Sequence, residues 1–261
     1  MQRGMYSGLF GALTNEHRMN AIANNLANIN TVGYKRDTMA FRDTFIQFAH
    51  DNIMEPIAHT RSDKLFPEPH HAARPRLAVS QTDFEQGSMK GTGGPLDLGI
   101  SGEGFFKIRT PQGDYYSRNG HFRLDAEGML ITEQGFQVLG DGGEITLPPG
   151  IKHLLIAEDG RIFGDGELLA QIDLVTVEDP AANLEKMGGN LFRARNDAEL
   201  AEEPVENPQM FQGFLEMPNV DVVYEMVNMI EAQRQFEAYQ KVMQTSDAID
   251  REATQKVGRS K

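Results

Sequence analysis

Several histidines and a glutamate that could bind a metal occur together in the first third of the chain. His70 and His71 follow Glu68, and His59 lies upstream. Imidazole and carboxylate groups are ordinary zinc ligands, but they form a site only when the fold brings them together at fixed geometry. The surrounding segment is polar and rich in proline, which favours a loop over a rigid metal centre. We therefore predict no metal at this place.

The acidic turns and the glycine-rich pieces offer two further kinds of site. Asp159, Asp165 and Glu167 carry oxygen ligands of the type that calcium prefers, but the EF-hand spacing is absent and Asp-Gly pairs are typical of tight turns. The pieces GEGFF and GDGGE lack the Gly-x-Gly-x-x-Gly spacing of a dinucleotide-binding turn. Cysteine is absent, which excludes disulfides and thiolate chemistry. No Gly-x-Ser-x-Gly elbow is present either. The sequence thus predicts no enzyme, no cofactor and no small-molecule substrate.

Charge and hydropathy argue against nucleic acid as a partner and against a membrane-spanning segment. The 38 acidic and 25 basic residues give a formal net charge of −13. Residues 1–36 hold four cations and one acid, so the excess of acid lies in the middle of the chain. A net-acidic surface disfavours nucleic-acid binding, because phosphates require clustered cations. No apolar run approaches the roughly 18 residues that span a membrane, and we expect no cleaved signal peptide at the N-terminus.

The first element that the sequence predicts is an N-terminal helix. Apolar residues from Met5 to Leu26 recur at spacings of four and three, with one interruption at Glu16. Glycines at 4, 8 and 11 each cost roughly 1 kcal/mol in a helix interior, so this helix should be weak alone. It is either packed on its own domain or ordered by a partner. The predicted stop signal consists of Asn24, Asn25, Asn28, Asn30 and Gly33.

A longer helix is predicted from about 220 to 255. Its length of roughly 50 Å exceeds what an ordinary domain core needs, which favours a helical assembly over a long helix on its own β domain. Gln residues in the same pattern favour a polar packing with many neighbours. The heptad positions are Val222, Met226, Met229, Gln233, Phe236, Gln240 and Met243, and Val223, Val227 and Ile230 widen the apolar stripe.

Between the helices the hydrophobic period changes from 3.6 to 2. Short apolar runs separated by Gly turns predict an all-β module of about ten strands, mainly antiparallel. The polar segment 181–210 is predicted to form loops over it. The turn pairs are Asn119-Gly120, Glu127-Gly128, Asp141-Gly142, Asp159-Gly160 and Asp165-Gly166.

These patterns predict an α+β protein whose two terminal helices pair as an axial coiled-coil layer around a central all-β domain. The expected divisions are an N-terminal axial helix at 1–36, a connecting loop or extended arm at 37–80, an outer β domain at 81–217, and a C-terminal axial helix and tail at 218–261. Prolines at 56, 67, 69 and 75 exclude regular central structure in the arm. Before them, Phe41, Phe45, Ile46 and Phe48 could continue a helix or form a short extended piece.

Three ordered blocks resemble the signatures of bacterial flagellar axial proteins, the rod, hook and hook-associated proteins. The first is NNLAN from Asn24 with Gly33-Tyr34-Lys35-Arg36. The second is GGPLDLGISGEGFFKI from Gly93 with YSRNGHF from Tyr116. The third runs from Asn219 to Glu237. The chain is most similar to the basal-body rod proteins of the proximal-rod type, with the distal-rod type as the alternative.

The resemblance implies a structural subunit that assembles with itself and with other rod and hook proteins into a hollow shaft. Such a shaft transmits motor torque to the hook. It also implies export by the flagellar type III apparatus, a location in the periplasm-spanning rod, and terminal helices that line the channel. The competing hypothesis is a soluble β-domain binding module dimerised by its helices. The residues expected to make assembly contacts are Leu9, Leu13, Asn24, Asn25, Leu26, Asn28, Val220, Val223, Met226, Val227, Met229, Ile230 and Phe236.

Overall fold

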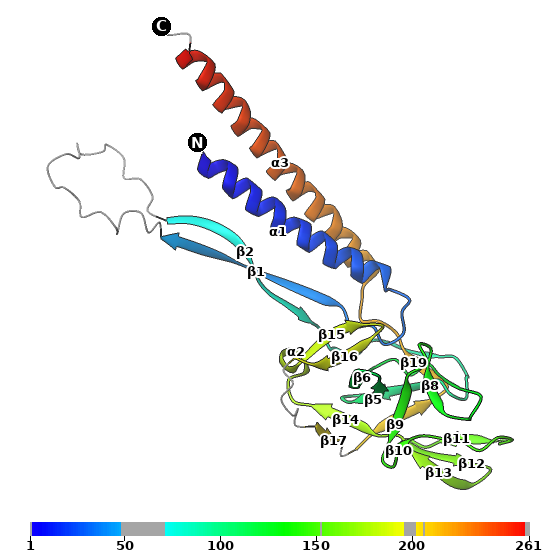
Figure 1. Ribbon diagram of the computed structural model, residues 1–261. Coiled ribbons are helices and arrows are strands. Elements are labelled where there is room, and N and C mark those ends of the chain that lie inside the picture. The colour runs from blue at the N-terminus through cyan, green and yellow to red at the C-terminus, as the bar shows by residue number, and fades with distance from the viewer. Residues whose placement is uncertain (1, 48–70, 152, 196–201, 206, 259–261) are drawn as a thin grey trace. The chain divides into compact units, whose positions relative to one another are not determined.

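The computed structural model describes residues 2–47, 71–151, 153–195, 202–205 and 207–258. The chain forms two compact units, whose elements are labelled in Figure 1. The helical unit comprises Met1–Ala23, Met39–Ser80 and Met226–Lys261, and the β unit comprises Asn24–Thr38 and Gln81–Glu225. Helices at both ends and a mainly antiparallel β domain confirm the predicted α+β class.

The first helix, α1 (Gln2–Ala27), covers the periodic segment that predicts it. It ends where asparagine side chains bond to the local backbone. The Asn28 side-chain amide donates to the backbone oxygen of Asn24 at 2.8 Å. Such local bonds compete with helical bonding and close helix ends. Gly33 follows with a φ of +68°, in the left-handed region that glycine adopts most readily. The predicted stop signal is confirmed.

The last helix, α3 (Val222–Gly258), matches the predicted span closely. Asp221 caps its start, because its Oδ1 accepts a hydrogen bond from the backbone N–H of Tyr224 at 3.0 Å. Glu225 lies in the first turn and Lys256 in the last turn, where their charges complement the helix dipole. Local capping and charge therefore determine where this helix begins and ends.

The two helices contact each other within the helical unit. A Cβ at Gly8 would lie 2.9 Å from Cγ of Met243, and a Cβ at Gly11 would lie 2.7 Å from Cδ1 of Tyr239. Rising numbers on α1 meet falling numbers on α3, so the helices run antiparallel. The glycines that weaken α1 alone are thus the residues that let α3 approach closely.

The face of α3 that is shielded from solvent contains three of the predicted heptad positions, Met229, Phe236 and Met243. Gln233 and Gln240 are exposed in the lone chain, so their packing against many neighbours stays a prediction. The spacing of the shielded residues is that of a coiled-coil seam, although coiled-coil packing itself stays a prediction. Apart from Asn228, the buried and half-buried positions between 225 and 250 are Glu225, Met229, Ala232, Phe236, Tyr239, Met243, Ser246 and Asp250.

The segment predicted as a connecting loop or extended arm contains a two-stranded sheet. Strands β1 (Asp37–Gln47) and β2 (His71–Thr82) pair with each other. Pro75 lies within β2, which has a single neighbouring strand, so it does not contradict the expectation that proline excludes regular central structure. Both strands of a two-stranded sheet have a free edge, where the missing N–H of proline costs little. Residues 48–70, with the candidate ligands His59, Glu68 and His70, lie outside the described residues.

The β unit contains the remaining strands and one short helix. They are β3 (Met89–Gly91), β4 (Leu98–Ser101), β5 (Phe105–Thr110), β6 (Gly113–Ser117), β7 (Phe122–Leu124), β8 (Leu130–Thr132), β9 (Gln137–Gly140), β10 (Gly143–Glu144), β11 (Leu154–Ile156), β12 (Arg161–Gly164), β13 (Glu167–Gln171), β14 (Leu174–Val177), α2 (Pro180–Asn183), β15 (Leu184–Gly188), β16 (Leu191–Ala194), β17 (Glu202–Pro204), β18 (Gln209–Gln212) and β19 (Phe214–Glu216).

These strands form one large sheet and three smaller ones. The large sheet has the order β15-β16-β6-β5-β9-β8-β7. In addition, β10 pairs with β9, β14 pairs with β5, and β17 pairs with β14. The smaller sheets are β11-β12-β13, β18-β4 and β19-β3. Every pair whose register the structure describes is antiparallel. Because β4 and β18 are far apart in sequence, the sheet pairing closes the unit over more than one hundred residues.

Apolar side chains from these sheets meet in one main core. The rings of Phe106 and Phe122 pack edge to face with centroids 5.0 Å apart. Burying each side chain of this size is worth about 1.5–3 kcal/mol, so the core can hold the β unit together without the helices. Its most deeply buried members include Leu98, Ile100, Phe106, Ile108, Leu130, Val138, Leu147, Ile162 and Met210.

Four of the five predicted turn pairs connect strands that pair with each other. Asp165-Gly166 is the clearest case: φ is +51° and +93°, and Gly164 faces Glu167 across the hairpin. Asn119-Gly120 is different, since it joins β6 to β7, which bond to other strands. The hairpin prediction is wrong there. A Cβ at Gly120 would lie 2.7 Å from the carbonyl carbon of Leu98, so this glycine permits a close backbone approach.

The prediction of loops over 181–210 is wrong for much of that segment. It contains part of α2 and the strands β15, β16, β17 and β18. Leu184, Leu191 and Phe192 are buried, and the Phe192 ring lies 5.0 Å from that of Phe84. A few well-placed apolar residues in a polar stretch are enough to complete a sheet whose other strands already exist.

Candidate assembly surface and junction

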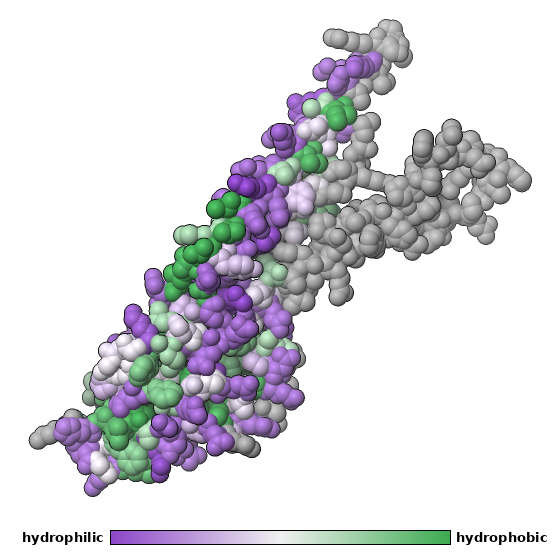
Figure 2. All heavy atoms as spheres, turned by 180° about the vertical axis from the view of Figure 1, so that it is seen from behind, coloured by the Kyte–Doolittle hydropathy of each residue, from purple (hydrophilic) through white to green (hydrophobic). Residues whose placement is uncertain are grey.

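Four residues predicted to contact neighbours form an exposed row at the start of α3, which we call the outer row. Val223 is 72 % exposed, Met226 54 %, Val227 50 % and Ile230 50 %. Their spacings place them on one side of the helix, opposite the shielded positions. Hydrophobic side chains along the helical part of the chain are visible in Figure 2. The outer row is therefore an apolar surface in contact with solvent.

The helix α1 carries a smaller exposed pair. Leu9 and Leu13 are both exposed and lie one helical turn apart. On the same helix Ala12, Asn15 and Ile22 are buried. Both helices thus present one shielded side and one apolar exposed side, which is the arrangement expected of a helix pair that still has surface to cover.

The other apolar residues in the predicted set do not share the outer row. Met229 and Phe236 are half-buried among the shielded positions of α3, and Leu26 and Val220 are half-buried as well. Tyr239, whose ring lies against Gly11, is outside the predicted set. Gly8 and Gly11 are the signal for such a contact in the sequence, because a glycine on one helix leaves room for a large side chain on the other.

Asn25 is a buried hydrogen-bonding centre of the β unit rather than a surface contact. Its side-chain N–H groups donate to the backbone oxygen of Asp37 at 3.0 Å and to Oε1 of Glu225 at 3.3 Å. Its Oδ1 accepts from the Tyr34 hydroxyl at 3.0 Å and from the Asp37 backbone N–H at 3.0 Å. Every hydrogen-bonding position of this amide is therefore filled. Sequence pattern alone predicts Asn25 only as part of a helix stop.

Asn24 and Asn28 act locally at the end of α1. The Asn28 amide also bonds to Oδ1 of Asn24 at 2.8 Å, and the Thr31 hydroxyl donates to Oδ1 of Asn28 at 3.2 Å. These bonds satisfy groups that the end of a helix leaves open. Their role as contacts with neighbouring subunits stays a prediction.

A buried ionic cluster lies next to this centre. Lys35 Nζ contacts Oε1 of Glu216 at 2.7 Å, and Arg118 Nη1 contacts Oε2 of the same carboxylate at 3.3 Å. Lys35 and Glu216 are 1 % exposed and Arg118 is 5 % exposed. Lys35 also donates to the backbone oxygen of Glu85 at 2.7 Å. One carboxylate thus holds two cations from segments that are far apart in sequence.

The motif residues beside these charges complete the same cluster. The Gly33 N–H donates to the backbone oxygen of Glu216 at 2.8 Å, and a Cβ at Gly33 would lie 2.7 Å from the Arg118 carbonyl oxygen. Arg36 donates its backbone N–H to Oδ1 of Asn219 at 2.7 Å and pairs with Asp83 at 2.7 Å. We call the set Asn25, Gly33, Tyr34, Lys35, Arg36, Arg118, Glu216, Asn219 and Glu225 the junction.

Burial shifts the pKa values of three side chains in the junction. Desolvation raises the pKa of Tyr34 above its ordinary value, and the nearby carboxylates of Asp37 and Glu225 raise it further. Desolvation lowers the pKa of Arg118, and that of Lys35 in the same way, although Glu216 opposes the shift of both cations. The buried groups are thus neutralised mainly by one another, as a structural cluster requires.

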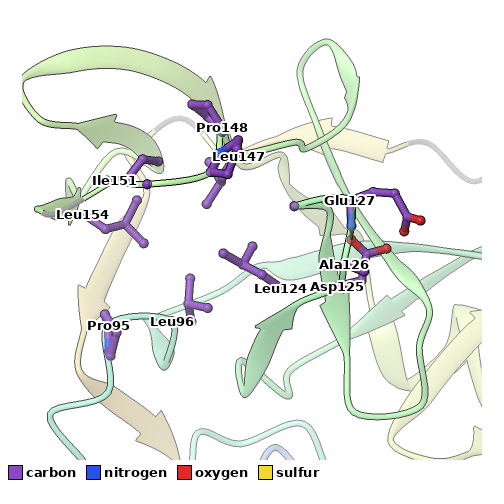
Figure 3. Close-up of a pocket in the computed structure, with 13 residues that line it drawn as sticks. Pro95, Leu96, Leu124, Asp125, Ala126, Glu127, Leu147, Pro148, Ile151 and Leu154 are labelled. Atoms are coloured by element: carbon purple, nitrogen blue, oxygen red, sulfur yellow. Dashed lines mark hydrogen bonds between the residues drawn. The ribbon is translucent and has the colours of Figure 1, made fainter.

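The part of the chain that the structure describes contains no candidate metal centre, because no group of three His, Cys, Asp or Glu side chains that could hold a metal occurs there. The β unit has a hollow of about 410 Å³, shown in Figure 3, lined mainly by apolar residues such as Leu96, Leu124 and Pro148. Its charged lining residues are Asp125 and Glu127.

Within the described ranges, neither α1 nor α3 has a stretch that is long and apolar enough to cross a bilayer.

Three family models match separate parts of the chain. Residues 5–35 match the flagella basal body rod protein model, residues 99–164 match the flagellar hook protein FlgE/F/G D1 domain, and residues 212–256 match the flagellar basal body rod FlgEFG protein C-terminal model. The first and last of these contain the two ends of the junction.

Full-length relatives agree with the family models. The chain is 34 % identical to the flagellar basal-body rod protein FlgF of Caulobacter vibrioides, over 99 % of each chain. It is 34 % identical to the flagellar basal-body rod protein FlgG of Bacillus subtilis, over 95 % of this chain and 97 % of that one. It is 35 % identical to FlgG of Borreliella burgdorferi, over 95 % of this chain and 96 % of that one.

Proposed function

Because the chain belongs to the flagellar basal-body rod protein family, we infer that it is a structural subunit of the bacterial flagellar basal-body rod and not an enzyme. Members of this family assemble with other axial proteins in the basal body. Family membership favours this function over the soluble binding module dimerised by its helices.

The outer row is the observation that carries the mechanism. Four apolar side chains that are each at least half exposed would remain in water in a lone chain. Covering them gains roughly 25 cal/mol for every Å² of apolar surface removed from water. A contact between the outer row of one subunit and a different surface of the next is head-to-tail, and repeating it with a non-closing rotation gives a helical polymer.

The finer assignment is to the proximal rod. The resemblance of the motif blocks and an alignment with FlgF that spans 99 % of both chains support it. We propose that the terminal helices form the inner layer of a hollow shaft that transmits torque to the hook. We also propose export through the flagellar type III apparatus without a cleaved signal and a position in the periplasm-spanning rod. A distal-rod or hook-type axial protein is the alternative.

Deletion of the coding sequence, followed by electron microscopy of isolated basal bodies, tests both the assignment to the rod and the finer assignment to its proximal part. We expect basal bodies that lack the rod beyond the inner base, non-motile cells, and restoration of both by the intact chain. A rod that is present but shortened would instead favour the distal type. Complete rods and hooks in the deletion strain would contradict the function itself.

A further inference from the structure

We propose that the junction stays folded in a lone subunit, and that Glu225 acts through Asn25 as a positioning residue that holds residues 24–38 against the segment that ends at Glu225 within the β unit. This proposal goes beyond membership of a rod. It concerns which part of one chain is ordered before any neighbour is present.

The hydrogen bonds around Asn25 connect the two ends of the chain directly. Asn25 lies at the end of α1 and Glu225 lies in the first turn of α3, 200 residues later, and their side chains meet at 3.3 Å. Both residues are buried, as is Tyr34, which also bonds to Asn25. A buried amide with a missing partner costs about 1–3 kcal/mol, so the four partners of Asn25 hold one another in place.

The ionic cluster fastens the same two ends to the sheets. The Glu216 carboxylate ends β19, six residues before α3 begins, and it binds Lys35 and Arg118. It also accepts the Gly87 backbone N–H at 3.0 Å. Breaking a buried pair leaves an uncompensated charge, which is strongly unfavourable. The junction therefore opens only when the β unit itself opens.

This arrangement changes where order should end in a free subunit. The predicted axial segments, 1–36 and 218–261, would place the junction motifs with the weak helices. In the structure Asn24–Thr38 and the residues up to Glu225 belong to the compact β unit. Fraying of lone helices should thus stop near Asn24 on one side and Glu225 on the other.

Hydrogen exchange of the purified, full-length chain at low concentration tests the first part. The backbone N–H groups of Gly33, Arg36, Asp37 and Gly87 all donate within the junction. We expect them to exchange within about tenfold of the slow amides of β5, and far more slowly than amides in the first four turns of α1. Exchange as fast as in those turns would overturn the proposal.

Variants of Glu225 separate positioning from mere stability. Glu225→Ala should speed exchange at Asp37 by on the order of tenfold, because the Asn25 amide that accepts from it loses a charged partner. Glu225→Gln keeps an oxygen that can accept from Asn25, and should restore most of the protection. Glu231→Ala, an exposed glutamate on the same helix, is the matched control and should change nothing. Equal exchange in all three variants would contradict the role of Glu225.

These measurements use the lone chain and no flagellum. Failure of the junction proposal would therefore leave the rod assignment standing. Complete rods in the deletion strain would refute the rod assignment without affecting the exchange data.

Discussion

The β unit and the helical unit differ in how far their charged and apolar side chains are shielded from solvent. In the β unit, Lys35, Arg118 and Glu216 are buried and matched with one another, and the apolar core is closed. In the helical unit, Met226 and Ile230 remain exposed. The β unit pairs its buried charges within itself, although exposed apolar residues remain on its surface as well. The exposed apolar residues of α3 instead form a row along one side of a helix, which we propose as an interface.

A substitution in each unit should therefore have a different kind of consequence. Changes in the helical unit should reduce assembly and leave unfolding of the β unit unchanged. Changes in the junction should lower the free energy of unfolding of the β unit. The following predictions test that separation.

Ile230→Asp should have the largest effect, an all-or-none loss of incorporation into the rod. It places a charge at the C-terminal end of the outer row, and burying an unpaired carboxylate against a neighbour is prohibitive. The residue is half exposed in the lone chain, so the midpoint of thermal unfolding of the β unit should not move. Motility in cells and nucleated polymerisation of the purified chain measure the loss.

Gln233→Asp is the control for Ile230→Asp. This neighbouring position is exposed and polar, so the same charge should be tolerated. Normal polymerisation of the Ile230→Asp chain would contradict the outer row as an assembly surface.

Glu216→Ala should destabilise the β unit by about 3–5 kcal/mol, because it leaves two buried cations without their carboxylate. Chemical denaturation followed by circular dichroism would show this as a lower midpoint. Glu185→Ala is the matched control, since its pair with Arg193 is partly exposed and such pairs are worth about 0–1 kcal/mol. Similar losses for the two variants would mean that burial of the Glu216 cluster does not matter.

Gly11→Ala sets two effects of opposite sign against each other. Alanine raises intrinsic helix stability by about 1 kcal/mol, but its Cβ would lie 2.7 Å from Cδ1 of Tyr239. Overpacking of this kind costs about 1–3 kcal/mol. We expect a lone chain with equal or greater helicity but a polymerisation threshold raised several-fold.

Tyr239→Leu in the Gly11→Ala background should restore part of the polymerisation, because it removes the ring that the new methyl group meets. Improved polymerisation of Gly11→Ala alone would show that helix propensity, not close approach, limits the helical unit.

The sequence predicts the periodic parts of this molecule well and the junction poorly. Repeating patterns define α1, α3 and most hairpins because each repeat points to a local structure. The bond between Asn25 and Glu225 has no local signal, since its partners are 200 residues apart. The resemblance of the motif blocks marks those residues as important, but it does not say that they face inward.

The predicted surface residues show the same limit. A helical stripe identifies Val223 and Ile230 as apolar, but it cannot say which side of α3 another helix covers. The shielded side is decided by Gly8 and Gly11 on α1, because the missing side chains admit Tyr239. Three of the predicted heptad positions, Met229, Phe236 and Met243, lie on that shielded side, whereas Gln233 and Gln240 are exposed.

Tyr34→Phe should have the smallest effect, and its pH dependence distinguishes the junction from the helices. Removing the hydroxyl deletes the bond to Oδ1 of Asn25, which is worth about 1 kcal/mol near neutral pH. Burial and the neighbouring carboxylates raise the folded-state pKa of Tyr34 above the unfolded value of about 10. The stabilising contribution of the neutral phenol is thus complete below pH 10 and is lost as the pH rises through the folded-state pKa. The phenylalanine variant has no such ionisation.

The difference in free energy of unfolding between the natural chain and Tyr34→Phe should therefore be constant from about pH 7 to 9 and shrink above pH 10. Comparing the two chains cancels the alkaline titration of Lys35 and of Tyr116, which both contain. Tyr224→Phe, at an exposed tyrosine, should leave the free energy of unfolding almost unchanged. A Tyr34→Phe difference that stays constant above pH 10 would mean that the Tyr34 hydroxyl is open to water. The N-terminal motif would then belong with the unfinished helical unit rather than with the closed β unit.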